Sequence, residues 1–350
     1  MEVDLGALQR NAQAIARHSG ARLLPVIKAD AYGLGAIPVA RVLAGLDPWG
    51  FGVATLGEAR ALREAGFTQR LLVLTPLLPR EYAAARALDA TPSLGAADSI
   101  VAWRDAGGGA YHLGIDTGMS RAGVRWTDVP ALAPLLAELP PEGAFTHFHS
   151  AELVDGSVDE QTRRFADAVR AMPVRPAILH AENSAAVAHL AGPSSYVLVR
   201  PGIYLYGVSC GGSLVPEPVV ALRAPVVETR ALSPGDTVSY DATFRATKPM
   251  RIATAAVGYA DGYRRALSNR GVALLSGRRV PVLGLVTMDM TMFDVSDVPC
   301  QTGDVLTLIG SDHAERLDVA DVARVGELSP YELLTGLRLR GAHVYTGTPS

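Results

Sequence analysis

The chain has 350 residues, a formal net charge of −3 and 49% hydrophobic residues, which allows one large or two ordinary domains and gives no basic surface for nucleic acid. Cys210 and Cys300 are too few and too far apart for a disulfide framework or a zinc site, so we expect no metal. The acidic N-terminus lacks a signal-peptide pattern, and no apolar run is long enough to span a bilayer. We therefore expect a soluble, cytoplasmic protein that binds neither nucleic acid nor membrane.

Short apolar strands alternate with helical segments over the first two hundred residues. The predicted strands are 23–29, 49–54, 71–75, 90–94, 110–116, 143–149, 176–181 and 196–200. The predicted helices are 6–18, 56–65, 98–105, 129–139, 159–171 and 185–190. This alternation predicts an α/β fold, a (β/α)8 TIM-type barrel. An open doubly wound sheet is the alternative, but no glycine-rich dinucleotide motif follows the first strand.

The residue pattern changes after Gly207, where short β-branched runs separated by turn signals predominate. The predicted strands are 219–221, 224–227, 237–240, 252–257, 272–275, 280–286, 291–295 and 305–309, followed by a helix at 330–337. This pattern predicts a mostly β C-terminal domain. Glycine and proline cluster at 211–218, so we place the domains at 4–215 and 216–350, with residues 1–3 as candidates for association with the second.

Lysine is rare in this chain, which has only Lys28 and Lys248 among its 32 basic residues. Lys28 ends an apolar run and precedes a glycine turn. A lysine amine can form a Schiff base with a carbonyl group, whereas an arginine guanidinium stays protonated and is not nucleophilic. Lys28 is therefore either a covalent amine or a strand-end lysine whose stem packs on apolar surface.

Polar residues recur where the predicted barrel strands end, and in this fold those ends converge on one site. They are Lys28, Asp116, Arg121, His147, His149, Asn183, Ser184 and Arg200, with the backbone amides of Gly202 and Ile203 beside them. Each has an ordinary alternative, such as a buried core histidine or a surface arginine. The loops after strands seven and eight are the usual phosphate site of this fold. An amine facing a phosphate cradle suits an aldehyde phosphate, and pyridoxal phosphate is the obvious candidate.

The motifs around these residues resemble the alanine racemase family, pyridoxal-phosphate enzymes with a barrel and a β domain, over essentially the whole chain. They are VIKADAYG at 26–33, DTGMSRAG at 116–123, THF at 146–148, NSA at 183–185 and RPGIY at 200–204. In the second domain they are VSY at 238–240, GYADG at 258–262 and MD at 288–289. For each tyrosine alone, ordinary amphipathic packing is the alternative explanation.

The resemblance implies a racemase that interconverts L- and D-alanine through a pyridoxal phosphate aldimine and supplies D-alanine for the cell wall. It implies that Lys28 holds the cofactor, Arg200 faces the pyridine nitrogen and His147 packs near the ring. It assigns the phosphate to Tyr32, Ser184, Gly202 and Ile203. Arginine keeps its own proton and should leave the pyridine nitrogen unprotonated, which weakens the electron sink and limits side reactions.

The resemblance also implies a homodimer with shared active sites. Racemisation removes a proton from one face and returns one to the other, so two opposed bases suit it. These would be Lys28 and Tyr240 of the partner subunit, and a tyrosine would need a cationic neighbourhood to serve as a base. Arg121 and the backbone of Met288 would bind the substrate carboxylate. Tyr259 and Arg265 would line the entrance.

Three positions depart from the family pattern. Gly114 stands where many members have a carbamylated lysine that orients the following arginine. We hypothesise that the Glu182 carboxylate replaces it across the barrel, with a bound chloride as the rival explanation. Leu339 replaces a tyrosine that binds phosphate in some members, and Leu285 replaces an entrance arginine, so the pocket could admit larger side chains.

Three alternatives to an alanine-specific racemase remain open. The first is an amino-acid racemase of broader specificity that also accepts serine, and the second is a decarboxylase of basic amino acids with the same fold. The third is a single-barrel cofactor carrier without enzyme activity. The β domain and Tyr240 argue against the carrier, since a carrier needs no opposed base.

Overall fold

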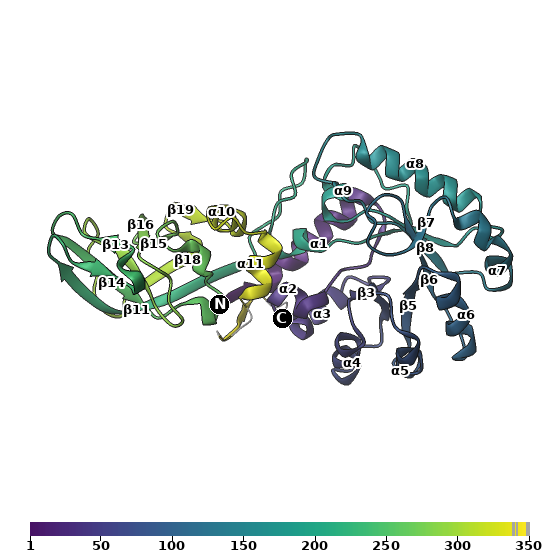
Figure 1. Ribbon diagram of the computed structural model, residues 1–350, viewed down its shortest axis with the longest axis horizontal. Helices are drawn as coiled ribbons and strands as arrows, with labels where there is room; N and C mark the ends of the chain where they lie inside the picture. Colours follow the sequence, from purple (N-terminus) through teal and green to yellow (C-terminus); the bar gives the residue numbers. More distant parts are fainter. Residues whose placement is uncertain (338–339, 341, 348–350) are drawn as a thin grey trace.

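The computed structural model describes residues 1–337, 340 and 342–347. The chain forms a compact barrel and an elongated β domain that lie end to end, with α1 (Leu5–Ser19) and α11 (Pro330–Gly336) between them (Figure 1). Within this described part of the chain, no helix has the length and apolar character needed to cross a membrane.

Eight parallel strands close the predicted barrel. In order around the ring they are β2 (Arg22–Leu23), β3 (Gly50–Val53), β4 (Arg70–Val73), β5 (Ala90–Leu94), β6 (His112–Asp116), β8 (Gly143–Phe145), β9 (Ile178–His180) and β10 (Leu198–Val199). Single bridges between Val26 and Gly52 and between Asn183 and Arg200 join β2 to β3 and β9 to β10. The (β/α)8 prediction is confirmed, although most strands are shorter than their apolar runs, and a short β7 (Val124–Arg125) pairs beside β6.

Four helices, α1, α4 (Leu56–Glu64), α9 (Ser184–Ala188) and α11, begin at a residue whose side chain accepts a hydrogen bond from a free backbone amide. The Asp4 carboxylate accepts from the Ala7 amide at 2.9 Å to start α1, and Thr55 forms a capping box with Glu58 at the start of α4. The predicted helices near 98–105, 159–171 and 185–190 are confirmed as α6 (Ala97–Asp105), α8 (Ser157–Arg170) and α9.

Several helical segments differ from the prediction, and α10 (Val319–Val325) in the second domain is one of them. The pattern did not predict α3 (Ala36–Ala44) or α5 (Tyr82–Ala87), which are short and carry few polar markers at their ends. The predicted helix at 129–139 divides into a 3-10 turn, η2 (Val129–Leu132), and α7 (Ala133–Glu138). Pro134 lies at the start of α7, a position where the missing N–H of proline costs nothing.

The second domain is mostly β, as predicted, and its strands form a closed ring. In order they are β11 (Val220–Leu232), β18 (Val305–Asp312), β15 (Val272–Leu275), β16 (Arg278–Leu283), β17 (Thr291–Asp294) and β14 (Met250–Ala255), which returns to β11. The two strands predicted at 219–221 and 224–227 are one 13-residue strand, because β11 changes partner from β18 to β14 along its length.

The chain ends meet in this second sheet. β1 (Glu2–Asp4) pairs with β11 on one side and with β20 (Val344–Thr346) on the other. At the junction of the two lobes, α11 packs on the turn that follows β2. A Cβ on Gly33 would lie 2.6 Å from the carbonyl oxygen of Leu334, so only glycine permits this approach.

Candidate active site

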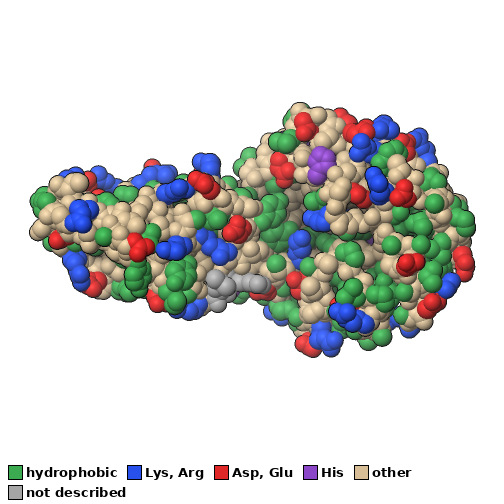
Figure 2. All heavy atoms as spheres, viewed as in Figure 1, with side chains coloured by type: hydrophobic (Ala, Val, Ile, Leu, Met, Phe, Trp, Pro, Cys, Tyr) green, Lys and Arg blue, Asp and Glu red, His purple; other side chains and the backbone are tan. Residues whose placement is uncertain are grey.

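A cavity of about 710 Å³ opens at the carboxyl end of the barrel strands, where Figure 2 shows the surface hollowed beside the β domain. Eight of the predicted site residues line it: Lys28, Tyr32, Arg121, His147, Ser184, Arg200, Gly202 and Ile203. They come from loops that follow five different strands. The structure therefore brings together the residues that the sequence assigned to the cofactor and to the substrate carboxylate, apart from Met288.

Lys28 begins a segment with an unusual backbone. The apolar run predicted a strand through residue 29, but the strand is shorter, and Ala29 to Tyr32 have φ angles between 52° and 57°. Four successive left-handed residues that are not glycine cost roughly 1–2 kcal/mol each. Backbone of this kind persists only where its surroundings hold it, and it is concentrated at functional sites. The turn directs the Lys28 side chain into the cavity.

The Glu58 carboxylate holds this turn from α4. Its Oε1 accepts from the Ala29 amide at 2.8 Å, and its Oε2 accepts from the Ala54 amide at 2.7 Å. One ionised side chain thus ties the residue after Lys28 to the end of β3. Hydrogen bonds to a carboxylate contribute more than neutral ones, so this clamp offsets part of the cost of the left-handed turn.

We expect Glu58→Gln to lower the free energy of unfolding by about 2 kcal/mol, because a glutamine has one acceptor oxygen and would place an NH2 group against a backbone amide. Urea denaturation measures the change. Glu64→Gln on the same helix is the matched control, because Glu64 is exposed and accepts no hydrogen bond from any described residue. Equal stability of the two variants would contradict the clamp.

The Lys28 amine lies in a setting that favours its neutral form. Burial lowers its pKa, and the positive charge of Arg121 lowers it further, while Glu58 partly offsets the effect. A neutral amine is the nucleophilic form, so the setting suits attack on a carbonyl group.

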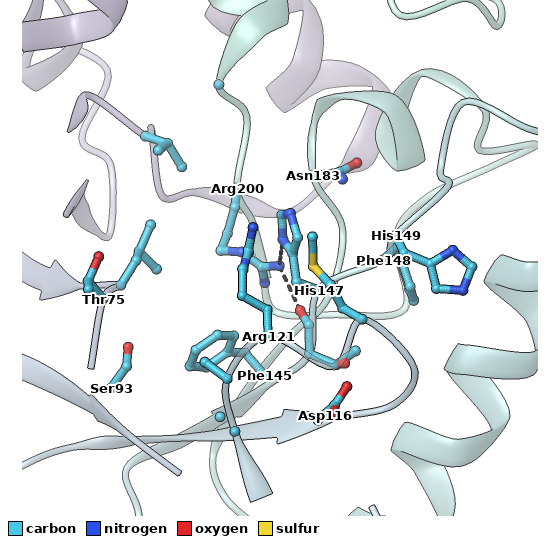
Figure 3. Close-up of a pocket in the computed structure, with 18 of the residues that line it drawn as sticks. Thr75, Ser93, Asp116, Arg121, Phe145, His147, Phe148, His149, Asn183 and Arg200 are labelled. Atoms are coloured by element: carbon cyan, nitrogen blue, oxygen red, sulfur yellow. Dashed lines mark hydrogen bonds between the residues drawn. The ribbon is translucent and has the colours of Figure 1, made fainter. Parts of the chain in front are cut away.

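Arg200 is 4% exposed and donates to the carbonyl oxygens of Thr146 at 2.7 Å and Ala181 at 2.9 Å. It also donates to Nδ1 of His147 at 3.3 Å, and Figure 3 shows these two side chains meeting at the cavity. Burial lowers the pKa of Arg200 to about 10, so it stays charged at neutral pH. Burial and the neighbouring Arg200 lower the pKa of His147 to about 3, so this ring is neutral and can pack against a flat cofactor.

The loops after β9 and β10 form a pocket of donors. The Ser184 hydroxyl oxygen accepts from the amides of Gly202 at 2.8 Å and Tyr204 at 3.3 Å, which leaves its own proton to donate. A Cβ on Gly202 would lie 2.5 Å from the Tyr32 hydroxyl oxygen, so glycine makes room for that hydroxyl. Among the described residues, the Ile203 amide has no acceptor. A free amide and two hydroxyl groups gathered at one place suit an anionic group such as a phosphate.

Gly114 lines the cavity, but Glu182 does not, so the hypothesis that the Glu182 carboxylate faces Gly114 is wrong. The register pairs Gly114 with Phe145 and Phe145 with His180, and these two rings stack at 5.1 Å beside the glycine. β9 ends at His180, and Glu182 instead lies near Ser194. Burial raises its pKa.

Arg121 therefore reaches the cavity without a carboxylate partner among the described residues. It is exposed and makes no hydrogen bond or ion pair with any described residue. An arginine of this kind is available to bind a carboxylate.

The four remaining predicted residues lie outside the cavity. Tyr240, Tyr259 and Met288 are 71%, 38% and 53% exposed, and Arg265 is exposed too. They belong to neighbouring loops of the β domain, because the segment 284–290 bonds to each loop. We call these four residues the β-domain loop surface. Within one chain, the β-domain loop surface does not line the cavity.

Two residues at or beside the cavity were not predicted from the sequence. Tyr331 on α11 lines the cavity with its ring 5.9 Å from that of Tyr32, and His180 accepts from Arg200. Helical position alone gave no signal for Tyr331, whereas His180 ends a predicted strand as the other site residues do. The predicted effect of Leu339 falls outside the described residues. Leu285 is half-buried in the segment that carries the β-domain loop surface.

Both domains of the chain match known proteins. The family model of the alanine racemase N-terminal domain matches residues 3–210, and that of the C-terminal domain matches residues 219–345. An alanine racemase from Deinococcus radiodurans is 38% identical over 97% of this chain and 96% of its own length.

Solved structures of alanine racemases match the fold of this chain over almost its whole length. The alanine racemase of Bacillus anthracis with bound L-Ala-P has a TM-score of 0.91 and 31% identity, covering 99% of this chain and 95% of that one. The enzyme of Bartonella henselae with covalently bound pyridoxal phosphate has a TM-score of 0.91 and 27% identity, covering 99% and 98%. The cavity, the β domain and these matches together show that the chain belongs to the alanine racemase family.

Proposed function

We propose that this protein interconverts L- and D-alanine with pyridoxal phosphate as its cofactor. The observation that carries the proposal is the cavity itself, in which an amine of lowered pKa, a buried guanidinium and a cluster of hydrogen-bond donors face one space. A cofactor with an aldehyde, a ring nitrogen and a phosphate matches these three groups.

The residues present fit that cofactor. Lys28 would hold it covalently, Arg200 would face its ring nitrogen, and His147 would pack near the ring. Its phosphate would be held by Tyr32, Ser184, Gly202 and Ile203. When bound, pyridoxal phosphate supplies an electron-withdrawing ring that makes the α-proton of an amino acid acidic. The protein must then position the substrate and move that proton.

Arg121 would bind the substrate carboxylate, since it is charged, lines the cavity and has no other partner in the described chain. Lys28 would hold or release the proton at its amine on one face of the α-carbon. Its lowered pKa brings the protonated and neutral forms of the amine closer in energy. A group that both accepts and donates a proton during the reaction needs both forms to be accessible.

The second base is proposed to be Tyr240 of the partner subunit. The β-domain loop surface is exposed in one chain, and a homodimer would let it cover the partner's cavity. Within the described residues, the Met288 amide donates no hydrogen bond, although its carbonyl accepts from Ala260 at 3.0 Å. That amide is free to meet a substrate carboxylate, while Tyr259 and Arg265 would border the entrance. A homodimer that supplies D-alanine for the cell wall from the cytoplasm completes the proposal.

The phosphate assignment predicts that Gly202→Ala weakens cofactor binding roughly tenfold, because the new methyl group would displace the Tyr32 hydroxyl and remove one donor. Absorbance titration of cofactor-free enzyme measures the dissociation constant. Gly192→Ala is the control, since a Cβ there meets no atom within 4 Å. Wild-type affinity in the Gly202→Ala enzyme would contradict the assignment.

The function is tested by incubating the holoenzyme with L-alanine in deuterated water. We expect loss of optical rotation with deuterium at Cα, and a survey of serine and larger amino acids will define specificity. Carbon dioxide release would indicate a decarboxylase. Cofactor absorbance without turnover of any amino acid would indicate a carrier.

A further inference from the structure

We propose that Glu142, at the amino end of the barrel, is a positioning residue that keeps Arg200 oriented as a hydrogen-bond donor at the opposite, carboxyl end. This inference rests on the proposed function, in which Arg200 faces the ring nitrogen of the cofactor. Residues at the amino end of such a barrel ordinarily contribute to stability alone. Here the side chain acts on the active site through two buried histidines.

A line of polar contacts joins the two ends through the barrel interior. Nη1 of Arg200 lies 2.8 Å from Nδ1 of His180, and Nε2 of His180 lies 2.8 Å from Nδ1 of His112. Nε2 of His112 lies 3.7 Å from Oε2 of Glu142, whose other oxygen pairs with Arg70. Both histidines are completely buried, so each depends on its neighbours in this line for hydrogen bonding.

The chemistry of the groups fixes the direction in which hydrogen bonds are donated along this line. Arginine only donates, so Nδ1 of His180 must accept. Burial lowers the pKa of both histidines, and each ring is neutral with one proton. His180 therefore carries its proton on Nε2 and donates to His112. The proton of His112 is then on Nε2, which faces the Glu142 carboxylate.

Glu142 is the acceptor that makes this direction favourable. Its contact with His112 and its pairing with Arg70 lower its pKa to about 2, so it is ionised in the neutral range. At 3.7 Å the contact is longer than a hydrogen bond, and the carboxylate acts by electrostatic attraction on the N–H of His112. Reversing both histidines would bring an N–H of His180 against the N–H of Arg200.

The backbone beside Glu142 leaves space for the His112 ring and is held by the neighbouring strands. A Cβ on Gly143 would lie 2.7 Å from both Cε1 and Nδ1 of His112, so only glycine leaves space for the ring. Glu142 itself is tied to the neighbouring strands, because its amide donates to Tyr111 at 3.0 Å and its carbonyl accepts from Ile178 at 3.3 Å. The carboxylate and the first histidine are thus placed by rigid elements.

The test combines histidine NMR with kinetics on the holoenzyme. In protein labelled with ¹⁵N at histidine, His112 and His180 should both be in the Nε2–H form, assigned through His112→Gln and His180→Gln. Glu142→Gln should convert part of both to the Nδ1–H form, because an amide can donate to His112 as well as accept from it, and Arg200 loses its hydrogen bond to His180 in that fraction. Its kcat should fall roughly tenfold, with KM for alanine within about twofold.

Glu142→Asp retains the charge and should restore the wild-type tautomers and most of kcat. Glu138→Gln is the control, because Glu138 is exposed and pairs only with Arg104 among the described residues. If Glu142→Gln does not fold, Gly143→Ala tests the same line by displacing His112. Unchanged tautomers, or a kcat within twofold of wild type, would overturn the inference. A wild-type enzyme that fails to racemise alanine would refute the proposed function, while the tautomers would still report on the line.

Discussion

The Lys28→Ala enzyme is expected to lose racemisation activity by about 10³-fold or more, because this amine is proposed both to hold the cofactor and to act as one of the two bases. Lys28 lines the cavity at the start of the left-handed turn, and its pKa is lowered by burial and by Arg121. Optical rotation of L-alanine solutions measures the loss of activity.

The same assignment has a covalent readout. Borohydride reduction of the wild-type holoenzyme, followed by peptide mass spectrometry, should find a pyridoxyl group on Lys28 and none on Lys248. Lys248 is the matched control, since it is the only other lysine in the chain and is exposed on the β domain. An adduct on Lys248, or an active Lys28→Ala enzyme, would remove the basis of the proposed mechanism.

Residue type and strand order were sufficient to predict which barrel residues share the cavity. Polar residues at the ends of predicted strands were expected to converge, and Lys28, Arg121, His147, Ser184 and Arg200 do line one cavity. This succeeded because parallel strands of a barrel all deliver their carboxyl ends to the same rim, whatever their lengths.

The details that depend on tertiary contacts were not accessible from the sequence. An apolar run cannot reveal that the chain turns left-handed at Ala29, because the Glu58 carboxylate that holds this turn lies on another element. Strand alternation also misplaced Glu182, since β9 ends before that residue. The strand that appeared to be two, β11, is continuous because its partner changes along its length.

Substitution of Tyr240 is the second change that we expect to cause a large loss of activity. Tyr240 is 71% exposed and does not line the cavity of its own chain, so it can act as the opposed base only from another subunit. Tyr240→Phe removes the hydroxyl while keeping the ring, and the variant should lose racemisation by about 10²–10⁴-fold.

Heterodimers between the two variants separate a shared site from a site within one chain. Co-expression of Lys28→Ala and Tyr240→Phe chains with different tags allows the mixed dimer to be purified. One of its two sites then combines Lys28 from one chain with Tyr240 of the partner subunit, and the other site lacks both. We therefore expect about half of the wild-type activity per dimer, from two nearly inactive parents. A dimer of Lys28→Ala with the Lys28→Ala, Tyr240→Phe double variant should stay inactive, because neither site has its lysine. If the first mixed dimer is no more active than its parents, Tyr240 does not act across the interface, and the second base must be sought among the residues of the same chain.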